Sequence, residues 1–129
     1  MPKVLLDTNV FIWLGENPEK ISINAAASIY SEMELFLSAA SIWEMAIKIK
    51  TDKLRLGFEL EEFVNANASK HSISILPIFL DAIFKTLELE LIHRDPFDRL
   101  IISQAMYKIF PSLAVILFLM LTLLNEFGK

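Results

Sequence analysis

The stretch "KVLLDTNVFIW", residues 3–13, decides the fold. Val4 to Leu6 form an uninterrupted apolar run, which is typical of a short buried strand, and Asp7 stands where that strand ends. Thr8 to Leu14 then suit a short helix, which Gly15 and Pro18 would stop. A buried strand that leads through an acid into a helix is typical of α/β proteins.

The rest of the chain repeats this alternation. Strands are expected over residues 34–39 and 71–78, and helices over residues 19–32, 41–54, 58–70, 79–91 and 96–109. Hairpin signals are few, so the pattern predicts a mostly parallel sheet with helices on both faces. Ligands of such open sheets bind beyond the carboxyl ends of the strands, where Asp7 is placed.

Helical spacing predicts which faces of two helices are buried. In the helix over residues 41–54 the apolar positions are Ile42, Met45, Ala46 and Ile49. In the helix over residues 58–70 the candidates are Phe58, Leu60, Phe63 and Val64.

Composition bounds the class of protein. The 129 residues suffice for one domain, and 54% apolar with 22% charged residues indicates a compact globular chain. The absence of cysteine excludes disulfides and thiolate chemistry, and two histidines argue against a histidine-rich zinc site. The net charge of −4 argues against stable duplex binding, but an enzyme that holds nucleic acid through divalent cations needs clustered acids.

The two ends of the chain differ in character. "MPKVLLDTNV" is too short an apolar run, interrupted by Asp7, for a signal peptide. "PSLAVILFLMLTLL", residues 111–124, is uncharged but shorter than the roughly 18 residues of a spanning helix. We therefore expect a cytoplasmic protein that does not span a membrane, with residues 1–108 as the main domain and residues 109–129 as an atypical apolar segment of it.

Each acid near a helix start has two interpretations. Asp7 is either a cap for the following helix or a site residue. Glu44 either completes a capping box with Ser41 or, if Ser38 is the cap, lies one turn further in without a capping role. In "HRDPFDRLIISQA", residues 93–105, Asp95 before Pro96 suits a cap, whereas Asp98 lies close to the apolar face and could pair with Arg99.

Together the acids suggest a metal site. In a doubly wound fold, Asp7, Glu44 and Asp98 can converge on one edge of the sheet. Three carboxylates share a dry cleft only with a cation or with raised pKa values. Oxygen ligands without cysteine or histidine favour Mg²⁺ or Mn²⁺ over zinc.

Three blocks of the sequence resemble the signature blocks of PIN-domain proteins, and within them the VapC-like toxins of toxin–antitoxin pairs. They are "VLLDTNVFIW", "LSAASIWEMAIK" and "HRDPFDRLIISQA", in this order, and the likeness runs from about Pro2 to about Tyr107. The resemblance implies an α/β/α sandwich and an Mg²⁺- or Mn²⁺-dependent endoribonuclease. Such proteins are usually homodimers, and a cognate antitoxin protein inhibits them.

The resemblance also assigns residues. Asp7, Glu44 and Asp98 match the three metal-binding acids, and Asp95 matches an acid beside the site. Thr8 and Asn9 match the polar residues that shape it, with Arg99 in support. Phe11, Trp13 and Trp43 are expected either in a groove for an antitoxin segment or in the core.

The chain departs from the family after Tyr107. Family members continue with a fourth strand and a fourth acid, whereas here Glu126 is the sole acid after Asp98. A frameshift or a degenerate tail would produce this change. An alternative function is therefore a catalytically inactive PIN-fold protein that only binds an antitoxin. Asn9 excludes an aspartyl-nucleophile phosphatase, which would need an acid there.

Overall fold

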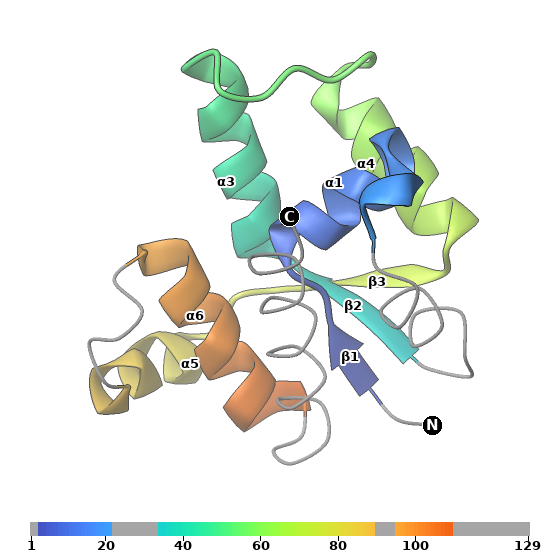
Figure 1. Cartoon of the computed structure of the whole chain (residues 1–129). Helices are drawn as coiled ribbons and strands as arrows, with labels where there is room; N and C mark the ends of the chain where they lie inside the picture. Colours follow the sequence, from blue (N-terminus) through green and yellow to red (C-terminus); the bar gives the residue numbers. More distant parts are fainter. Residues whose placement is uncertain (1–2, 22–33, 90–94, 110–129) are drawn as a thin grey trace.

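The structure, a computed structural model, describes residues 3–21, 34–89 and 95–109 (Figure 1). The strands are β1 (Lys3–Leu5), β2 (Glu34–Ser38) and β3 (Ile73–Leu76). The α-helices are α1 (Thr8–Glu16), α3 (Ala39–Lys50), α4 (Leu60–Lys70), α5 (Leu80–Lys85) and α6 (Pro96–Gln104). Short helical turns are η1 (Pro18–Lys20), η2 (Thr86–Glu88) and η3 (Ala105–Ile109). Most of the helix expected over residues 19–32 lies outside the described residues.

The described strands form one parallel sheet in the order β1-β2-β3, which confirms the parallel arrangement predicted from the sequence. Val4 pairs with Leu35, and Leu37 pairs with Ile75. Each crossover between neighbouring strands passes through helical segments, as a parallel connection requires. The carboxyl ends of all three strands therefore meet at the same edge of the sheet.

Alternation along the strands divides the core into two clusters, one on each face of the sheet. Val4, Leu6 and Leu37 pack with residues of α1 and α4. Leu5 points to the opposite face and packs with Ile101 of α6. The molecule thus has three layers, with α1 and α4 on one face of the sheet and α5 and α6 on the other (Figure 1). The predicted α/β/α arrangement is confirmed.

Two details of the predicted core and the length of one predicted helix are wrong. Phe58 is 64% exposed because α4 begins only at Leu60, so Phe58 precedes the helix. Ala46 is exposed, because the buried face of α3 passes instead through Ser41, Glu44 and other residues on that side. The helix expected over residues 79–91 is shorter: α5 ends at Lys85 and η2 follows it.

The aromatic residues expected in a groove or in the core lie in different environments. Phe11 is fully buried and meets Phe63 edge to face, with ring centroids 5.9 Å apart. Trp13 is half-buried against the same cluster. Trp43 is 61% exposed and lies edge-on to Phe97, at 5.3 Å between centroids. The core interpretation therefore holds for Phe11, and of the three Trp43 has the most exposed surface.

No helix within residues 3–21, 34–89 and 95–109 is long and apolar enough to cross a membrane. The apolar segment, residues 111–124, lies outside the described residues.

Candidate active site

Asp7 lies at the carboxyl edge of the sheet, as predicted. Strand pairing continues past β1, because the Leu6 N–H donates to the Phe36 carbonyl at 2.8 Å. Asp7 follows at once and occupies the cap position of α1, with 7% of its surface exposed. Among the described residues its side chain makes no capping hydrogen bond to α1. Capping therefore does not explain this buried acid.

The residues after Asp7 tie α1 to α3. Thr8 is buried, and its hydroxyl donates to Ser41 Oγ at 2.8 Å. This bond holds the first turn of α1 against the first turn of α3, one turn before Glu44. Asn9, the other predicted supporting residue, is exposed.

Ser38, and not Ser41, caps α3. The Ser38 hydroxyl oxygen accepts from the Ala40 N–H at 3.0 Å and donates to Gln104 Oε1 at 2.5 Å. Gln104 in turn donates to the Pro77 carbonyl at 3.1 Å. The end of β2, the end of α6 and the residue after β3 are thus joined by one buried network. The capping-box interpretation of Glu44 is wrong, because Glu44 lies in the second turn of a helix that begins at Ala39.

Glu44 is a buried acid of which one carboxylate oxygen has a partner and the other has none in the described part of the chain. The residue is 7% exposed, and its Oε2 lies 3.1 Å from Lys48 Nζ, one turn further along α3. Its other oxygen, Oε1, is buried and has no hydrogen-bond partner within the described part of the chain. A buried carboxylate oxygen without a donor is energetically costly unless something compensates its charge. A cation bound at Oε1 would supply that compensation.

Glu44 and Asp95 line one hollow of about 190 Å³ between α3 and α6. Lys48, Lys53 and Phe97 also line it. Asp95 Oδ1 accepts from the N–H groups of Phe97 and Asp98, at 2.8 and 3.2 Å, so Asp95 caps α6 as its place before Pro96 predicts. The cap holds the start of α6 beside Glu44.

Asp98 is half-buried in the first turn of α6. The neighbouring Arg99 uses Nη2 to donate to the carbonyls of Thr86 and Leu89, at 2.7 and 3.3 Å. These bonds satisfy one carbonyl group at the start of η2 and one just after its end, and they fix α6 against the preceding segment. In these bonds Arg99 acts as a structural support for α6.

The predicted acids thus reach the same region without forming one compact group. Asp7 and Glu44 are attached to the two helices that the Thr8–Ser41 bond joins, and Asp95 shares the hollow with Glu44. No three histidine, aspartate or glutamate side chains among residues 3–21, 34–89 and 95–109 form a group that could hold a metal ion. The assignment of Asp7, Glu44 and Asp98 as metal ligands stays a prediction.

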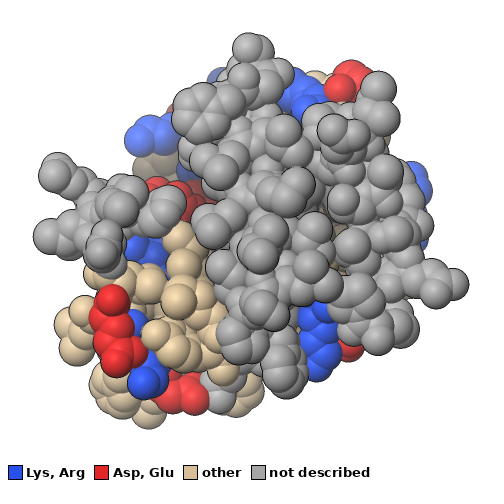
Figure 2. All heavy atoms as spheres, turned by 60° about the horizontal axis from the view of Figure 1, so that its bottom comes forward, with Lys and Arg blue, Asp and Glu red and all other residues tan. Residues whose placement is uncertain are grey.

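Sequence reasoning overlooked the two lysines of the hollow and the glutamine of the network. The signal for Lys48 was its spacing, since a glutamate and a lysine four residues apart meet on one side of a helix. Lys53 and Gln104 lack such a signal, because their contacts depend on a turn and on the docking of α6. Figure 2 shows one face of the molecule, and the acidic and basic side chains of described residues visible there lie interspersed.

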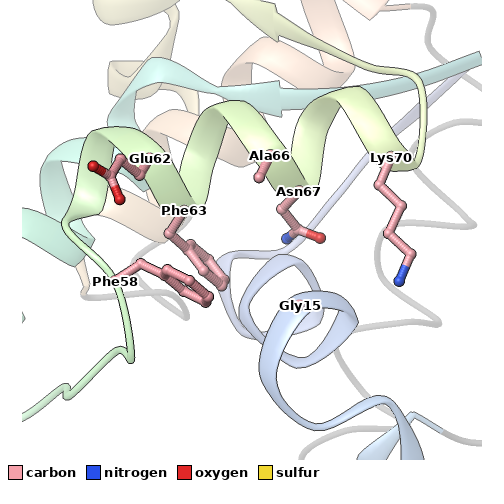
Figure 3. A pocket seen from close by; sticks show the side chains of 7 residues that line it. All are labelled: Gly15, Phe58, Glu62, Phe63, Ala66, Asn67 and Lys70. Atoms are coloured by element: carbon pink, nitrogen blue, oxygen red, sulfur yellow. The ribbon is translucent and has the colours of Figure 1, made fainter.

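A second hollow, of about 300 Å³, lies between α1 and α4, on a different part of the molecule (Figure 3). Asn67 reaches across it, and its Nδ2 donates to the Phe11 carbonyl at 2.7 Å. Gly15 makes this close approach possible, because a Cβ there would lie 2.6 Å from Cε1 of Phe63. Glu62 and Lys70 stand toward its two ends (Figure 3). This hollow contains none of the predicted site residues.

Comparison with known proteins supports the resemblance seen in the three sequence blocks. The model of the PIN domain family matches residues 4–113, which span Asp7, Glu44 and Asp98. No curated protein and no solved structure matches the chain. The matched range covers most of the sequence and includes β2, β3 and all of β1 except Lys3. The chain therefore belongs to the PIN domain family.

Proposed function

We propose that this chain is a metal-dependent endoribonuclease of the VapC-like toxin type. PIN domains are generally nucleases that bind RNA and use divalent metal ions. The observation that carries the proposal is the buried Oε1 of Glu44, which has no hydrogen-bond partner within the described residues. Most buried side-chain polar atoms in folded proteins have a hydrogen-bond partner, so this oxygen is a candidate ligand for a cation.

The residues fit a hard divalent cation by their chemistry. Asp7, Glu44 and Asp98 would hold Mg²⁺ or Mn²⁺, with Asp95 in a secondary position. Mg²⁺ usually keeps several waters and needs one or two carboxylates, so a compact group of three is not required. Asp7 and Glu44 are both 7% exposed, and poorly hydrated carboxylates gain more from a cation than exposed ones.

The chain's own residues would divide the work of hydrolysis. The ion supplies Lewis-acid activation of water and of the phosphate when it is bound. One carboxylate of the set accepts the proton of the attacking water. Thr8 and Ser41 hold α1 against α3, and the Asp95 cap holds the start of α6 beside Glu44. In the proposal, acids carried by these three helices share one bound ion. The proposal includes RNA as substrate, a homodimer as the assembly and an antitoxin protein as the inhibitor.

A change of stability with metal tests the site without relying on activity. Mn²⁺ should raise the melting temperature of the wild-type chain, and Asp7→Asn should remove that rise. Asp52→Asn is the matched control, since it removes an exposed carboxylate at φ 59°, a conformation that asparagine also adopts. A full rise with Mn²⁺ in Asp7→Asn would contradict the shared site.

Two observations favour a second function, an inactive PIN-fold protein that only binds an antitoxin. The described acids do not form a ready-made group of three, and the sequence has no aspartate after Asp98. This alternative predicts a stable complex with the antitoxin and no cleavage of RNA with Mn²⁺. Weak cleavage that depends on metal and on Asp98 would exclude it.

A further inference from the structure

The hollow between α3 and α6 has charges of both signs. Glu44 and Asp95 supply carboxylates, and Lys48 and Lys53 supply ammonium groups. The hollow thus brings two ammonium groups beside two carboxylates. A site that uses carboxylates for a cation and ammonium groups for a phosphate needs this arrangement.

Lys48 is held in place and still has donors to offer. Its ammonium group lies 3.1 Å from Glu44 Oε2, and 36% of its side chain is exposed. An ammonium group has three N–H donors, and this ion pair needs one of them. Glu44 is buried in the second turn of α3 and holds the Lys48 ammonium group by this ion pair, and Lys48 lines the hollow.

Lys53 is brought back to the same hollow by the turn that ends α3. Asp52 adopts a φ of 59°, which reverses the chain direction. The N–H groups of Lys53 and Leu54 then both donate to the Lys48 carbonyl, at 2.8 and 3.1 Å. The backbone of Lys53 is thus tied to the backbone of Lys48, and both side chains line the hollow.

From this juxtaposition we propose that Lys48 and Lys53 bind a backbone phosphate of the RNA and thereby position the strand beside Glu44 and Asp95. This inference rests on the proposed ribonuclease function and names a further part of its site. The competing explanation is that the lysines only stabilise the carboxyl end of α3, where positive charge is favourable. That role would affect stability and leave RNA binding unchanged.

The test is the salt dependence of RNA binding by the full chain. Fluorescence anisotropy of a labelled single-stranded oligouridylate, with chelator present to prevent cleavage, gives Kd over a series of salt concentrations. Each lost phosphate contact to a single strand should reduce the slope of log K against log salt by about 0.7. We expect that reduction in Lys53→Met and about twice that in Lys48→Met/Lys53→Met.

Lys50→Met is the matched control, because Lys50 is an exposed lysine of the same helix that does not line the hollow. It should keep the wild-type slope. The double variant also removes Lys48, the ion-pair partner of buried Glu44, and this loss could unfold it. Lys53 lies in an exposed turn, so the single variant Lys53→Met should stay folded and keeps the test valid. In a cleavage assay, Lys53→Met should raise KM and leave kcat nearly unchanged, since it removes ground-state binding.

The outcomes separate this inference from the proposed function. Equal slopes in wild type, Lys53→Met and Lys50→Met overturn the phosphate site, even if the wild-type chain cleaves RNA. A wild-type chain that binds no RNA also overturns it. A slope that depends on Lys53, in a chain that never cleaves RNA with Mn²⁺, supports the phosphate site and contradicts the nuclease.

Discussion

Removing the hydroxyl of Ser38 should destabilise the protein strongly, because that one group serves two partners. It accepts from the Ala40 N–H at the start of α3 and donates to Gln104 Oε1, and both Ser38 and Gln104 are fully buried. Ser38→Ala loses the cap, which costs about 1 kcal/mol. It also leaves Gln104 Oε1 without its hydroxyl donor, which costs roughly 1–3 kcal/mol more.

The sum, about 2–4 kcal/mol, is measurable by urea denaturation. For a chain of this size it corresponds to a fall in melting temperature of roughly 8–16 °C, at about 4 °C per kcal/mol. The control is Ser69→Ala, which removes an exposed hydroxyl from α4 and should change stability by less than about 0.5 kcal/mol. A double-mutant cycle with Gln104→Leu should show a coupling of about 1 kcal/mol between the two side chains.

The result matters for the site as well as for the fold. If Ser38→Ala were no more destabilising than Ser69→Ala, Ser38 would not cap α3. Glu44 could then return to a capping role with Ser41, and the reason to regard its buried carboxylate as a ligand would disappear.

Two further predictions concern the region between α1 and α4. Gly15→Ala should destabilise the protein by about 1–3 kcal/mol, since the added Cβ would lie 2.6 Å from Phe63. The control is Gly57→Ala, which should be neutral or slightly stabilising, because nothing lies within 4 Å of a Cβ there. Equal stabilities of the two variants in urea would refute the close approach. Burial, with a further contribution from Lys70, lowers the pKa of His71 below 6.5, so the unfolded chain binds the proton more tightly. The free energy of unfolding should therefore fall as pH drops through 6.5 toward the pKa of His71 in the folded protein. His71→Gln should lose less of this free energy than wild type over the same pH window. Identical pH profiles of stability for the two proteins would contradict this.

The general fold was predictable because it follows from local patterns. The apolar run from Val4 to Leu6 and the acid after it gave the first strand and the edge of the sheet. Asp95 before Pro96 gave the cap of α6, since both residues act on their own neighbours. Helical spacing was less reliable: the buried face of α3 carries Ser41 and Glu44, which an apolar pattern cannot indicate.

The arrangement of the site depended on contacts between distant residues. The sequence favoured Ser41 as the cap, with Ser38 as the alternative. Ser38 is the cap, and it also bonds to Gln104, 66 positions away, which local spacing cannot indicate. Lys53 reaches the hollow through the turn at Asp52, which sequence spacing does not reveal. The sequence indicated the three acids as candidate metal ligands. It could not indicate the distances between them, because these depend on how α1, α3 and α6 dock.

The most direct test of the central claim is cleavage of single-stranded RNA by the purified chain with Mn²⁺, compared with Asp98→Asn and Glu44→Gln. We expect weak cleavage by the wild type that chelator abolishes, and at least a tenfold lower rate in each variant. Cleavage that is equal in all three proteins, or absent from the wild type with Mn²⁺ present, would contradict the claim that these carboxylates form a nuclease site.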